Sequence, residues 1–253
     1  MKLLRFRTGK VEMKGVLIDN KIRRIQGSIF EEFLVTNEEY ALDKVEFLPP
    51  VIPSKVVCVA RNYAAHAKEL GNDVPTTPLI FIKPNTSVTS HEGEIIYPPS
   101  SKQVDFEGEL AVVIGKHCKN IKPEKALDYV LGYTIMNDFT ARDIQKEENK
   151  FTRAKCFDTF APLGPYIETE LDTKNLRIET KVNGETKQNG TTDMMIFDIP
   201  NLISFISEIM TLLPGDVIAT GTPSGVGPVK IGDVVTVEVE NIGILRNYIC
   251  ASK

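Results

Sequence analysis

The sequence has no tryptophan, three histidines and four cysteines among its 253 residues. The cysteines, Cys58, Cys118, Cys156 and Cys250, lie far apart and form no Cys-x-x-Cys pair, which excludes a zinc ribbon and a thioredoxin-type redox motif. Positive charge is not in excess either, because 30 basic side chains face 34 acidic ones and the formal charge is -4. A nucleic acid is therefore not the expected partner, since its phosphates require a basic surface.

Long apolar segments are missing as well. Arg5 and Arg7 interrupt the N-terminal segment before an apolar signal region can form, and no later run approaches the length needed to span a membrane. The composition, 42% hydrophobic and 25% charged, is that of an ordinary globular protein. We expect a soluble, cytoplasmic protein with reduced thiols and no membrane partner.

Turn signals divide the first fifty residues into short strands. Residues 3–18 alternate loosely between apolar and polar, with a break at 8–10 and a second reversal at 19–20 before Ile22–Ile25. This pattern predicts a short antiparallel meander. Three prolines within 49–53 then favour an extended connection. We predict a small N-terminal β module over residues 1–50 and a larger domain over residues 54–253.

The larger domain has more strand than helix. Its expected strands are short apolar or alternating segments, at 55–60, 79–82, 110–114, 217–219 and 234–239, and Asn183-Gly184 predicts a hairpin turn. Helical periodicity and end signals predict four helices, at 62–70, 123–130, 140–148 and 200–210. The charge-rich stretch Lys146–Lys150 is typical of a solvated helix end rather than a binding patch. The predicted fold class is α+β and strand-dominated.

Three carboxylates indicate a metal site. Glu107 and Glu109 are two apart in an extended segment, so they share a face and sit about 7 Å apart along the strand. A solvated strand face is the alternative. The apolar run that follows indicates that the strand enters the core, where two adjacent carboxylates need a compensating positive charge. Asp138 ends a predicted strand, with a helix N-cap as its alternative role. Oxygen ligands alone select Mg²⁺ or Mn²⁺, with Ca²⁺ as a further candidate.

Other polar side chains have the spacing of a catalytic site. His66 and Glu69 are three apart on one helix, where the carboxylate can orient a general base; an exposed helix pair is the alternative. Arg142 and Gln145 also share a helix face, and a surface salt bridge is the alternative for this arginine. Further candidates for contact with a substrate anion are Lys83 and Lys155, at the ends of apolar segments, and Thr222 in the glycine-rich loop over 221–227. A plain loop is the alternative for 221–227.

These segments, taken in order, resemble the fumarylacetoacetate hydrolase family from about Ser54 to about Arg246. The resemblance rests on Arg61–Tyr63 with His66 and Glu69, Ile82–Pro84, Asp105–Glu109, Asn137-Asp138 with Thr140–Asp143, Lys155 with Phe157–Thr159, and Gly221–Pro223 with Gly225–Gly227. It implies a rolled, mixed β-sheet core with a few flanking helices, a homodimer, and a catalytic role for residues 54–253.

The resemblance also implies site roles. It gives a Mg²⁺ or Mn²⁺ site on Glu107, Glu109 and Asp138, and a mobile lid helix with His66 and Glu69. Lys155 joins these two as a catalytic residue, and the implied substrate contacts come from Lys83, Arg142, Gln145 and Thr222. The short N-terminal module is similar to that of compact members that cleave acylpyruvates, decarboxylate oxaloacetate, or isomerise hydroxylated heptadienedioates from aromatic catabolism.

We therefore expect an enzyme that acts on small 2-oxo acids through a metal-stabilised enolate, by hydrolysis, decarboxylation or isomerisation. The sequence leaves the choice among these three reactions open. One alternative is a non-catalytic, metal-stabilised dimer that binds 2-oxo acids. A phosphoryl-transfer metalloenzyme is the other, although no phosphate-binding loop is present.

Overall fold

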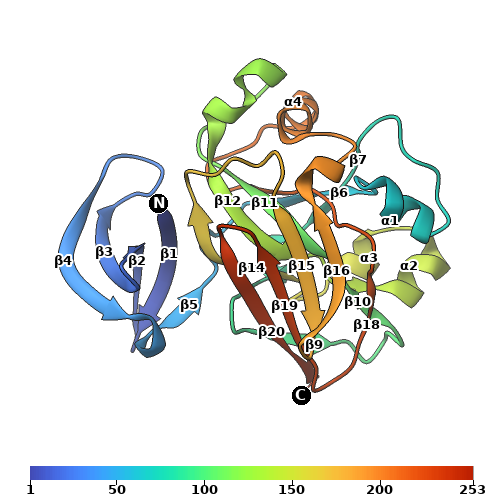
Figure 1. Cartoon of the computed structure of the whole chain (residues 1–253), viewed down its shortest axis with the longest axis horizontal. Helices are drawn as coiled ribbons and strands as arrows, with labels where there is room; N and C mark the ends of the chain where they lie inside the picture. Colours follow the sequence, from blue (N-terminus) through green and yellow to red (C-terminus); the bar gives the residue numbers. More distant parts are fainter. Residues whose placement is uncertain (253) are drawn as a thin grey trace.

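The computed structural model describes residues 1–252 and consists mainly of strands, with short helices around them (Figure 1). This architecture confirms the predicted strand-dominated α+β class with mixed sheets. Over the same residues, no helix combines the length and the apolar character needed to cross a membrane.

The largest sheet in the described part of the chain has twelve strands. Its main path runs β4-β3-β2-β1-β14-β12-β11-β17-β6-β7, with β5 paired to β1 and β8 to β14. The pairs β17 with β6 and β14 with β8 are parallel, so the sheet is mixed. The strands are β1 (Lys2–Thr8), β2 (Val11–Ile18), β3 (Lys21–Gly27), β4 (Phe33–Ala41), β5 (Glu46–Leu48), β6 (Val56–Ala60), β7 (Leu79–Lys83), β8 (Val88–Ser90), β11 (Gly108–Ile114), β12 (Val130–Asn137), β14 (Ala161–Glu168) and β17 (Val217–Ala219).

Two smaller sheets complete the β structure. One has the order β16-β15-β19-β20-β9 and the other β13-β10-β18. Asn183 and Gly184 both have positive φ, at 51° and 83°, and they connect β15 to β16 as the predicted hairpin. The strands are β9 (Glu94–Tyr97), β10 (Val104–Phe106), β13 (Thr140–Ala141), β15 (Arg177–Val182), β16 (Glu185–Thr191), β18 (Gly227–Val229), β19 (Val234–Val239) and β20 (Gly243–Ala251).

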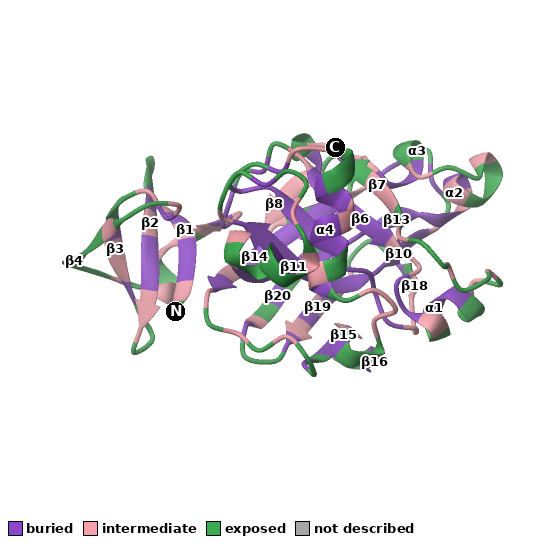
Figure 2. Cartoon of the chain, turned by 90° about the horizontal axis from the view of Figure 1, so that it is seen from above, coloured by how far each residue is buried: buried purple, intermediate pink, exposed green. Residues whose placement is uncertain are grey.

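Strand β11 lies at the centre of the core and is buried along its whole length (Figure 2). Leu110 and Val112 pack into one apolar cluster with the five-stranded sheet and helix α4 (Ile199–Ile209), whereas Ala111 and Val113 pack into a second cluster. A strand buried on both faces needs an apolar run of this kind. The position of β11 is therefore rigidly fixed, and so is the segment that enters it.

The N-terminal meander continues the large sheet. Strand β1 pairs with β14 through Lys2 and Leu3, and Leu3 also packs into the second core cluster. The sequence predicted β1 to β3 but not β4, because β4 is mostly exposed and has no alternating buried face. The division into residues 1–50 and 54–253 stays a proposal.

Helix α4 has the predicted length, shifted by one residue, whereas the other predicted helices are shorter or of another type. Helix α1 spans Ala64–Glu69, and α2 spans Arg142–Glu148 because Thr140 and Ala141 pair as β13. The helix expected at 123–130 is a 3-10 helix, η3 (Pro123–Tyr129), which buries only Ala126 and so lacks the apolar stripe that stabilises an α-helix. The remaining short helices are α3 (Thr152–Lys155), η1 (Leu42–Lys44), η2 (Asn85–Ser87) and η4 (Thr192–Met194).

Candidate metal centre and active site

The segment that carries Glu107 and Glu109 crosses between two sheets. Glu107 lies between β10 and β11, which belong to different sheets, and its amide donates to Asn137 Oδ1 at 2.8 Å. At Gly108 the backbone passes so close to β15 that a Cβ would lie 2.2 Å from Thr180 Oγ1. A side chain at position 108 would therefore force the buried Thr180 and Val237, or the segment itself, to shift, and glycine avoids this clash between the two glutamates.

The three predicted metal ligands lie together. The carboxylates of Glu107, Glu109 and Asp138 offer oxygen atoms within 4.8 Å of one another. Their residues are only 5%, 2% and 1% exposed, so the alternative of a solvated strand face is wrong. The alternative helix N-cap role of Asp138 is wrong too, because the N-cap of α2 is Ala141.

Cations contact two of the three carboxylates. Lys155 Nζ donates to Glu107 Oε2 at 2.8 Å and to Asp138 Oδ2 at 2.6 Å, and Arg142 Nη2 pairs with Glu107 Oε1. Burial alone would raise the pKa of Glu107, but the charges of Lys155 and Arg142 hold it well below its usual range. Burial opposes the charge of Lys155 as well, yet Asp138 and Glu107 raise the pKa of this lysine above its ordinary value. The ion pairs of Glu107 with Lys155 and Arg142 are therefore charged at neutral pH.

Glu109 differs from its two neighbours. Within residues 1–252 its carboxylate accepts one hydrogen bond, from the amide of Gly221 at 2.8 Å, and no cation contacts it. Burial, together with the charges of Asp138 and Glu107, raises the pKa of Glu109 well above its ordinary value. A buried carboxylate next to two ionised ones requires a further positive charge. The all-oxygen donor set fits a hard divalent cation such as Mg²⁺ or Mn²⁺.

A cavity of about 460 Å³ opens above the triad. Its lining includes five of the other residues predicted from the sequence, namely His66, Arg142, Gln145, Lys155 and Thr222. Lys146 and Lys150 line it too, so the expected solvated helix end is also part of the cavity wall. The volume is in the range of pockets that bind small molecules.

Lys83 and Glu69 do not line the cavity. Lys83 has no exposed surface, and its Nζ donates to Asp138 Oδ1 at 2.5 Å and to the carbonyls of Phe139 and Phe160 at 3.1 and 2.7 Å. The structure thus places Lys83 beneath a metal-ligand candidate, where direct contact with a substrate is blocked.

His66 is buried, with 4% of its surface exposed, so the alternative of an exposed helix pair is wrong for the histidine. Its Nδ1 lies 3.3 Å from Glu69 Oε2. The same carboxylate accepts hydrogen bonds from the amide of Gly225 at 3.0 and 3.2 Å. Glu69 therefore connects α1 both to the histidine and to the glycine-rich loop.

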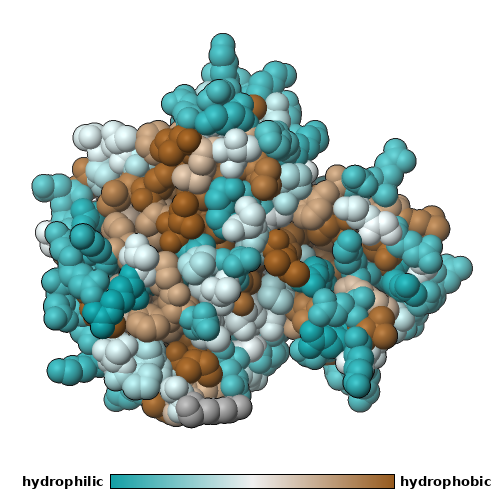
Figure 3. Space-filling view, turned by 180° about the vertical axis from the view of Figure 1, so that it is seen from behind, coloured by the Kyte–Doolittle hydropathy of each residue, from teal (hydrophilic) through white to brown (hydrophobic). Residues whose placement is uncertain are grey.

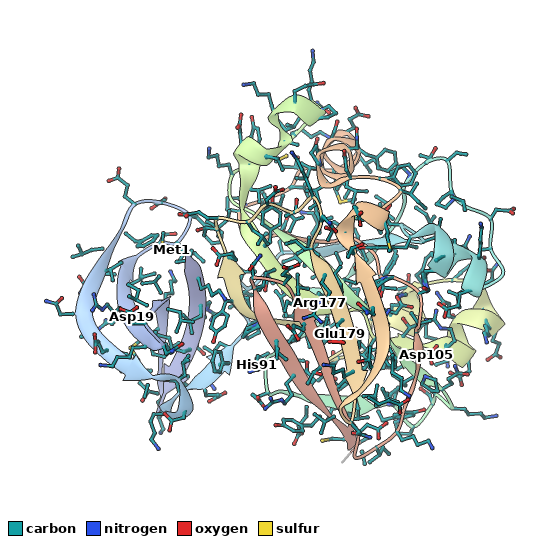
Figure 4. The ribbon with its side chains drawn as sticks, in the orientation of Figure 1. Met1, Asp19, His91, Asp105, Arg177 and Glu179 are labelled. Carbon is teal, nitrogen blue, oxygen red and sulfur yellow. The ribbon has the colours of Figure 1, made fainter. Side chains whose placement is uncertain are left out.

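Arg142 is buried in a network rather than on the surface, so the surface salt bridge is wrong for this residue. Its Nε donates to Asp105 Oδ2 at 2.8 Å and its Nη1 to Gln145 Oε1 at 2.5 Å. Asp105 lies on β10, on the side of the molecule where α2 and α3 lie (Figure 4). The network fixes the guanidinium next to Glu107.

Sequence reasoning missed two residues that hold the site in place. Gln188 on β16 accepts from the amide of Gly108 at 3.0 Å and donates to Thr222 Oγ1 at 2.7 Å. Asn62 joins the start of α1 to the carbonyl of Thr220 at 2.8 Å. Strand β16 contains no apolar side chain, so its sequence does not show that Gln188 points inward, and the partners of Asn62 lie more than 130 residues away.

Comparison with known proteins agrees with this geometry. The model of the fumarylacetoacetate (FAA) hydrolase C-terminal family matches residues 55–250, and a model for Rv2993c-like N-terminal segments matches residues 1–50. The chain belongs to the fumarylacetoacetate hydrolase family.

Its relatives include proteins with enzyme names. The chain is 56% identical to an uncharacterised protein of Methanocaldococcus jannaschii over 197 residues, which cover 78% of this chain and 83% of that protein. It is 44% identical to an oxaloacetate tautomerase of Bacillus subtilis over 226 residues, 83% of this chain and 75% of the relative. The crystal structure of 2-hydroxyhepta-2,4-diene-1,7-dioate isomerase from Mycobacterium marinum superposes with a TM-score of 0.92 at 42% identity, covering 100% of this chain and 99% of that one.

Proposed function

We propose that this protein is a divalent-metal-dependent enzyme that acts on small 2-oxo acids through an enolate. The observation that carries the proposal is the buried triad of Glu107, Glu109 and Asp138 at the end of a cavity, with Glu109 lacking a cation partner. A bound Mg²⁺ or Mn²⁺ would act as a Lewis acid that polarises a 2-oxo carboxylate and stabilises the enolate next to it.

The chain's own residues supply binding and proton transfer. His66 is the proposed general base, because it is a buried imidazole that lines the cavity and has a carboxylate at Nδ1. Arg142 and Lys155 present fixed positive charge to the substrate carboxylate and to charge that develops during the reaction. Gln145 and Thr222 offer polar contacts from two further walls.

Lys83 takes a different role from the predicted substrate contact. Because its buried ammonium donates a hydrogen bond to Asp138 Oδ1, we propose that Lys83 positions this metal ligand. Glu69 has a related role, since it orients His66 and fixes α1 to the loop at Gly225.

Within this chemistry, we propose proton transfer as the reaction class. One relative is named an oxaloacetate tautomerase and another a hydroxyheptadienedioate isomerase, and both names describe proton transfer next to a 2-oxo group or its enol. This supports proton transfer ahead of C-C bond hydrolysis or decarboxylation. The test is to incubate the Mg²⁺-loaded protein with acylpyruvates, oxaloacetate and hydroxylated dienedioates, and to follow enol absorbance with product identification.

Two alternatives predict different results in that test. A metal-stabilised dimer without activity loses thermal stability on metal removal but converts none of the panel. A phosphoryl-transfer enzyme of the common nucleotide-binding type would need a phosphate-binding loop, whereas the glycine-rich loop over 221–227 lacks the Gly-Lys-Ser/Thr ending of such a loop. The second alternative is therefore disfavoured.

We also propose a homodimer. Apolar side chains gather on one face of the larger part of the molecule (Figure 3), and Ile82 on β7, at the end of the large sheet, is 44% exposed. Contiguous exposed apolar surface is typical of protein interfaces. Sedimentation equilibrium at micromolar concentration tests this, and a monomer mass would contradict it.

A further inference from the structure

The side chains of Gln188 and Thr222 close a ring of hydrogen bonds around Gly108, the residue between two metal-ligand candidates. The Gly108 amide donates to Gln188 Oε1 at 3.0 Å, and Gln188 Nε2 donates to Thr222 Oγ1 at 2.7 Å. The Thr222 hydroxyl donates in turn to the Gly108 carbonyl at 2.8 Å. Gln188 has no exposed surface and Thr222 is 3% exposed, so losing any of these bonds would leave a buried polar group without its partner.

The neighbours of Gln188 fix the orientation of its amide. Its Nε2 also donates to the carbonyl of Pro223 at 2.8 Å, while its Oε1 accepts from Gly108. A flipped amide would place oxygen against the carbonyl and nitrogen against the N–H, so both bonds would be lost. The group that Gln188 presents to Thr222 is therefore a donor.

The ring leaves the Thr222 oxygen with an acceptor and no donor. A threonine hydroxyl has one proton and two lone pairs. In Thr222 the proton is used for the Gly108 carbonyl, and one lone pair accepts from Gln188. Thr222 lines the cavity, so the second lone pair is what its oxygen can offer to a ligand. This differs from the contact with a substrate anion expected from the sequence, because an anionic oxygen has no proton to donate.

Other polar side chains of the cavity have the opposite polarity. Gln145 Oε1 accepts from Arg142 Nη1, so the amide nitrogen of Gln145 is the part that remains for a ligand. Arg142 and Lys155 carry only donors. These three residues line the cavity and serve the acceptor groups of a ligand, its carboxylate oxygens among them. Thr222 is left for a ligand group that donates.

Thr222 lies at the metal end of the cavity, which is the end at the acidic triad. Its hydroxyl donates to Gly108, which separates Glu107 from Glu109. The amide of the preceding residue, Gly221, donates to Glu109 Oε2 at 2.8 Å. The ligand group nearest to Thr222 therefore belongs to the part of the ligand that a metal on the triad would hold.

We propose that Thr222 accepts a hydrogen bond from an N–H or O–H group of the ligand next to the metal, and that Gln188 is the positioning residue that fixes this polarity. The proposal rests on the proposed function, since a metal on the triad must hold the ligand. It assigns carboxylate binding to the donors on the other walls and removes the Thr222 hydroxyl from that role.

The test compares oxamate with oxalate, which have nearly the same shape and differ at one position, where oxamate has an amide nitrogen and oxalate a carboxylate oxygen. Calorimetry at saturating Mn²⁺ gives the affinity for each ligand. Thr222→Val keeps the shape of the side chain but removes the oxygen. It should weaken oxamate binding by about tenfold, the size of one hydrogen bond, and leave oxalate binding unchanged. Thr222→Ser keeps the hydroxyl and should bind both ligands as the wild type does.

Thr220→Val is the matched control. The Thr220 hydroxyl donates to the Leu110 carbonyl on the same strand at 2.8 Å, but Thr220 does not line the cavity. This variant loses a comparable buried hydrogen bond and should bind both ligands with wild-type affinity. Gln188→Met removes the donor to Thr222, so the hydroxyl is no longer held in one direction. The ratio of oxamate affinity to oxalate affinity should therefore fall in Gln188→Met.

Weaker oxalate binding with unchanged oxamate binding in Thr222→Val would make Thr222 a donor to the anion and overturn the proposal. An equal effect on both ligands, or no effect on either, would overturn it as well, because a purely structural threonine does not discriminate between them. A wild-type affinity ratio in Gln188→Met contradicts the positioning role. Absence of binding of both ligands to the wild type contradicts the proposed function, and the ligand contact with it.

Discussion

The Lys83 ammonium donates a 2.5 Å hydrogen bond to Asp138 Oδ1 and has no exposed surface. A positioning role predicts that Lys83→Met weakens Mn²⁺ binding by about 10- to 100-fold, as is typical when a group that supports a metal ligand is lost. A direct substrate contact would instead leave metal affinity unchanged. Calorimetric titration of the metal-stripped variant distinguishes the two roles.

The control for this variant is Lys55→Met. Lys55 pairs with the buried Asp216 away from the cavity, so its loss removes a comparable ion pair without touching the triad. Both variants should lower the free energy of unfolding, by about 3–5 kcal/mol at most. Unchanged Mn²⁺ affinity in Lys83→Met would contradict the positioning role and leave Lys83 with a purely structural one.

Removing the charge of Glu109 and removing that of Glu107 should have different effects on the stability of the metal-free protein. Glu109→Gln removes a buried carboxylate that has no cation contact, so the metal-free protein should be at least as stable as the wild type. Glu107→Gln takes away one of the two carboxylate partners of Arg142 and of Lys155 and should cost up to about 3–5 kcal/mol. Both should weaken Mn²⁺ binding by at least about 100-fold. Chemical denaturation and calorimetry check both effects, and equal destabilisation by the two changes would argue against the unpaired state of Glu109.

His66→Ala should lower turnover by about 100-fold, a loss typical of removing a general base. Mn²⁺ and oxalate should still bind, because the triad and its cations are untouched. Glu69→Gln should have a smaller effect, since the imidazole stays in the cavity with poorer orientation. Steady-state kinetics on the best substrate of the panel provides the measurement. Near-normal turnover of His66→Ala would make another group the base.

The burial of His91 leads us to expect that the stability of the protein depends on pH. It lies close to the N-terminal strands (Figure 4), beside Phe47, and its Nδ1 accepts a hydrogen bond from the Arg246 amide at 3.1 Å. Burial lowers the pKa of His91 below its ordinary value; Arg246 lowers it further, and Glu92 opposes both. The unfolded chain therefore binds the proton more readily, so this contribution to stability is complete above about pH 6.5 and is lost as the pH falls below it.

The measurement is the melting temperature between pH 7 and pH 5. His91→Asn keeps an acceptor for the amide without a titrating group, so its melting temperature should fall less steeply with pH than that of the wild type. His117→Asn changes an exposed histidine and should keep the wild-type slope. Identical slopes in all three proteins would show that His91 is not the titrating group.

Local pattern was enough to predict the central strand and the metal-ligand candidates. The apolar run after Glu109 predicts a buried strand, and the two glutamates where this strand enters the core need a compensating charge. The sequence of residues 105–114 therefore predicts both the central strand and two of the metal-ligand candidates. Strand β4 escaped prediction because its residues are mostly exposed and it is an edge strand held by pairing with β3. Local sequence contains no signal for such a partner.

Side-chain direction accounts for the other differences. The sequence predicts that Lys83 ends an apolar strand, but it does not show toward which face of the sheet the ammonium points. In the structure the ammonium donates to Asp138. The segment from Lys146 to Lys150 has the composition of a solvated helix end, yet Lys146 on α2 and Lys150 just after it both line the cavity. Long flexible cations take their role from tertiary structure, which spacing along the chain does not specify.

The central claim, a metal-dependent 2-oxo acid enzyme, is tested most directly by titrating Mn²⁺ into metal-stripped protein while following the enol absorbance of the best substrate. We expect activity to be absent at first, to rise with bound Mn²⁺, and to reach a plateau at one ion per chain, with no such rise in Glu109→Gln. Full turnover in the metal-stripped protein, or Mn²⁺ binding at the triad without any conversion, would contradict the account.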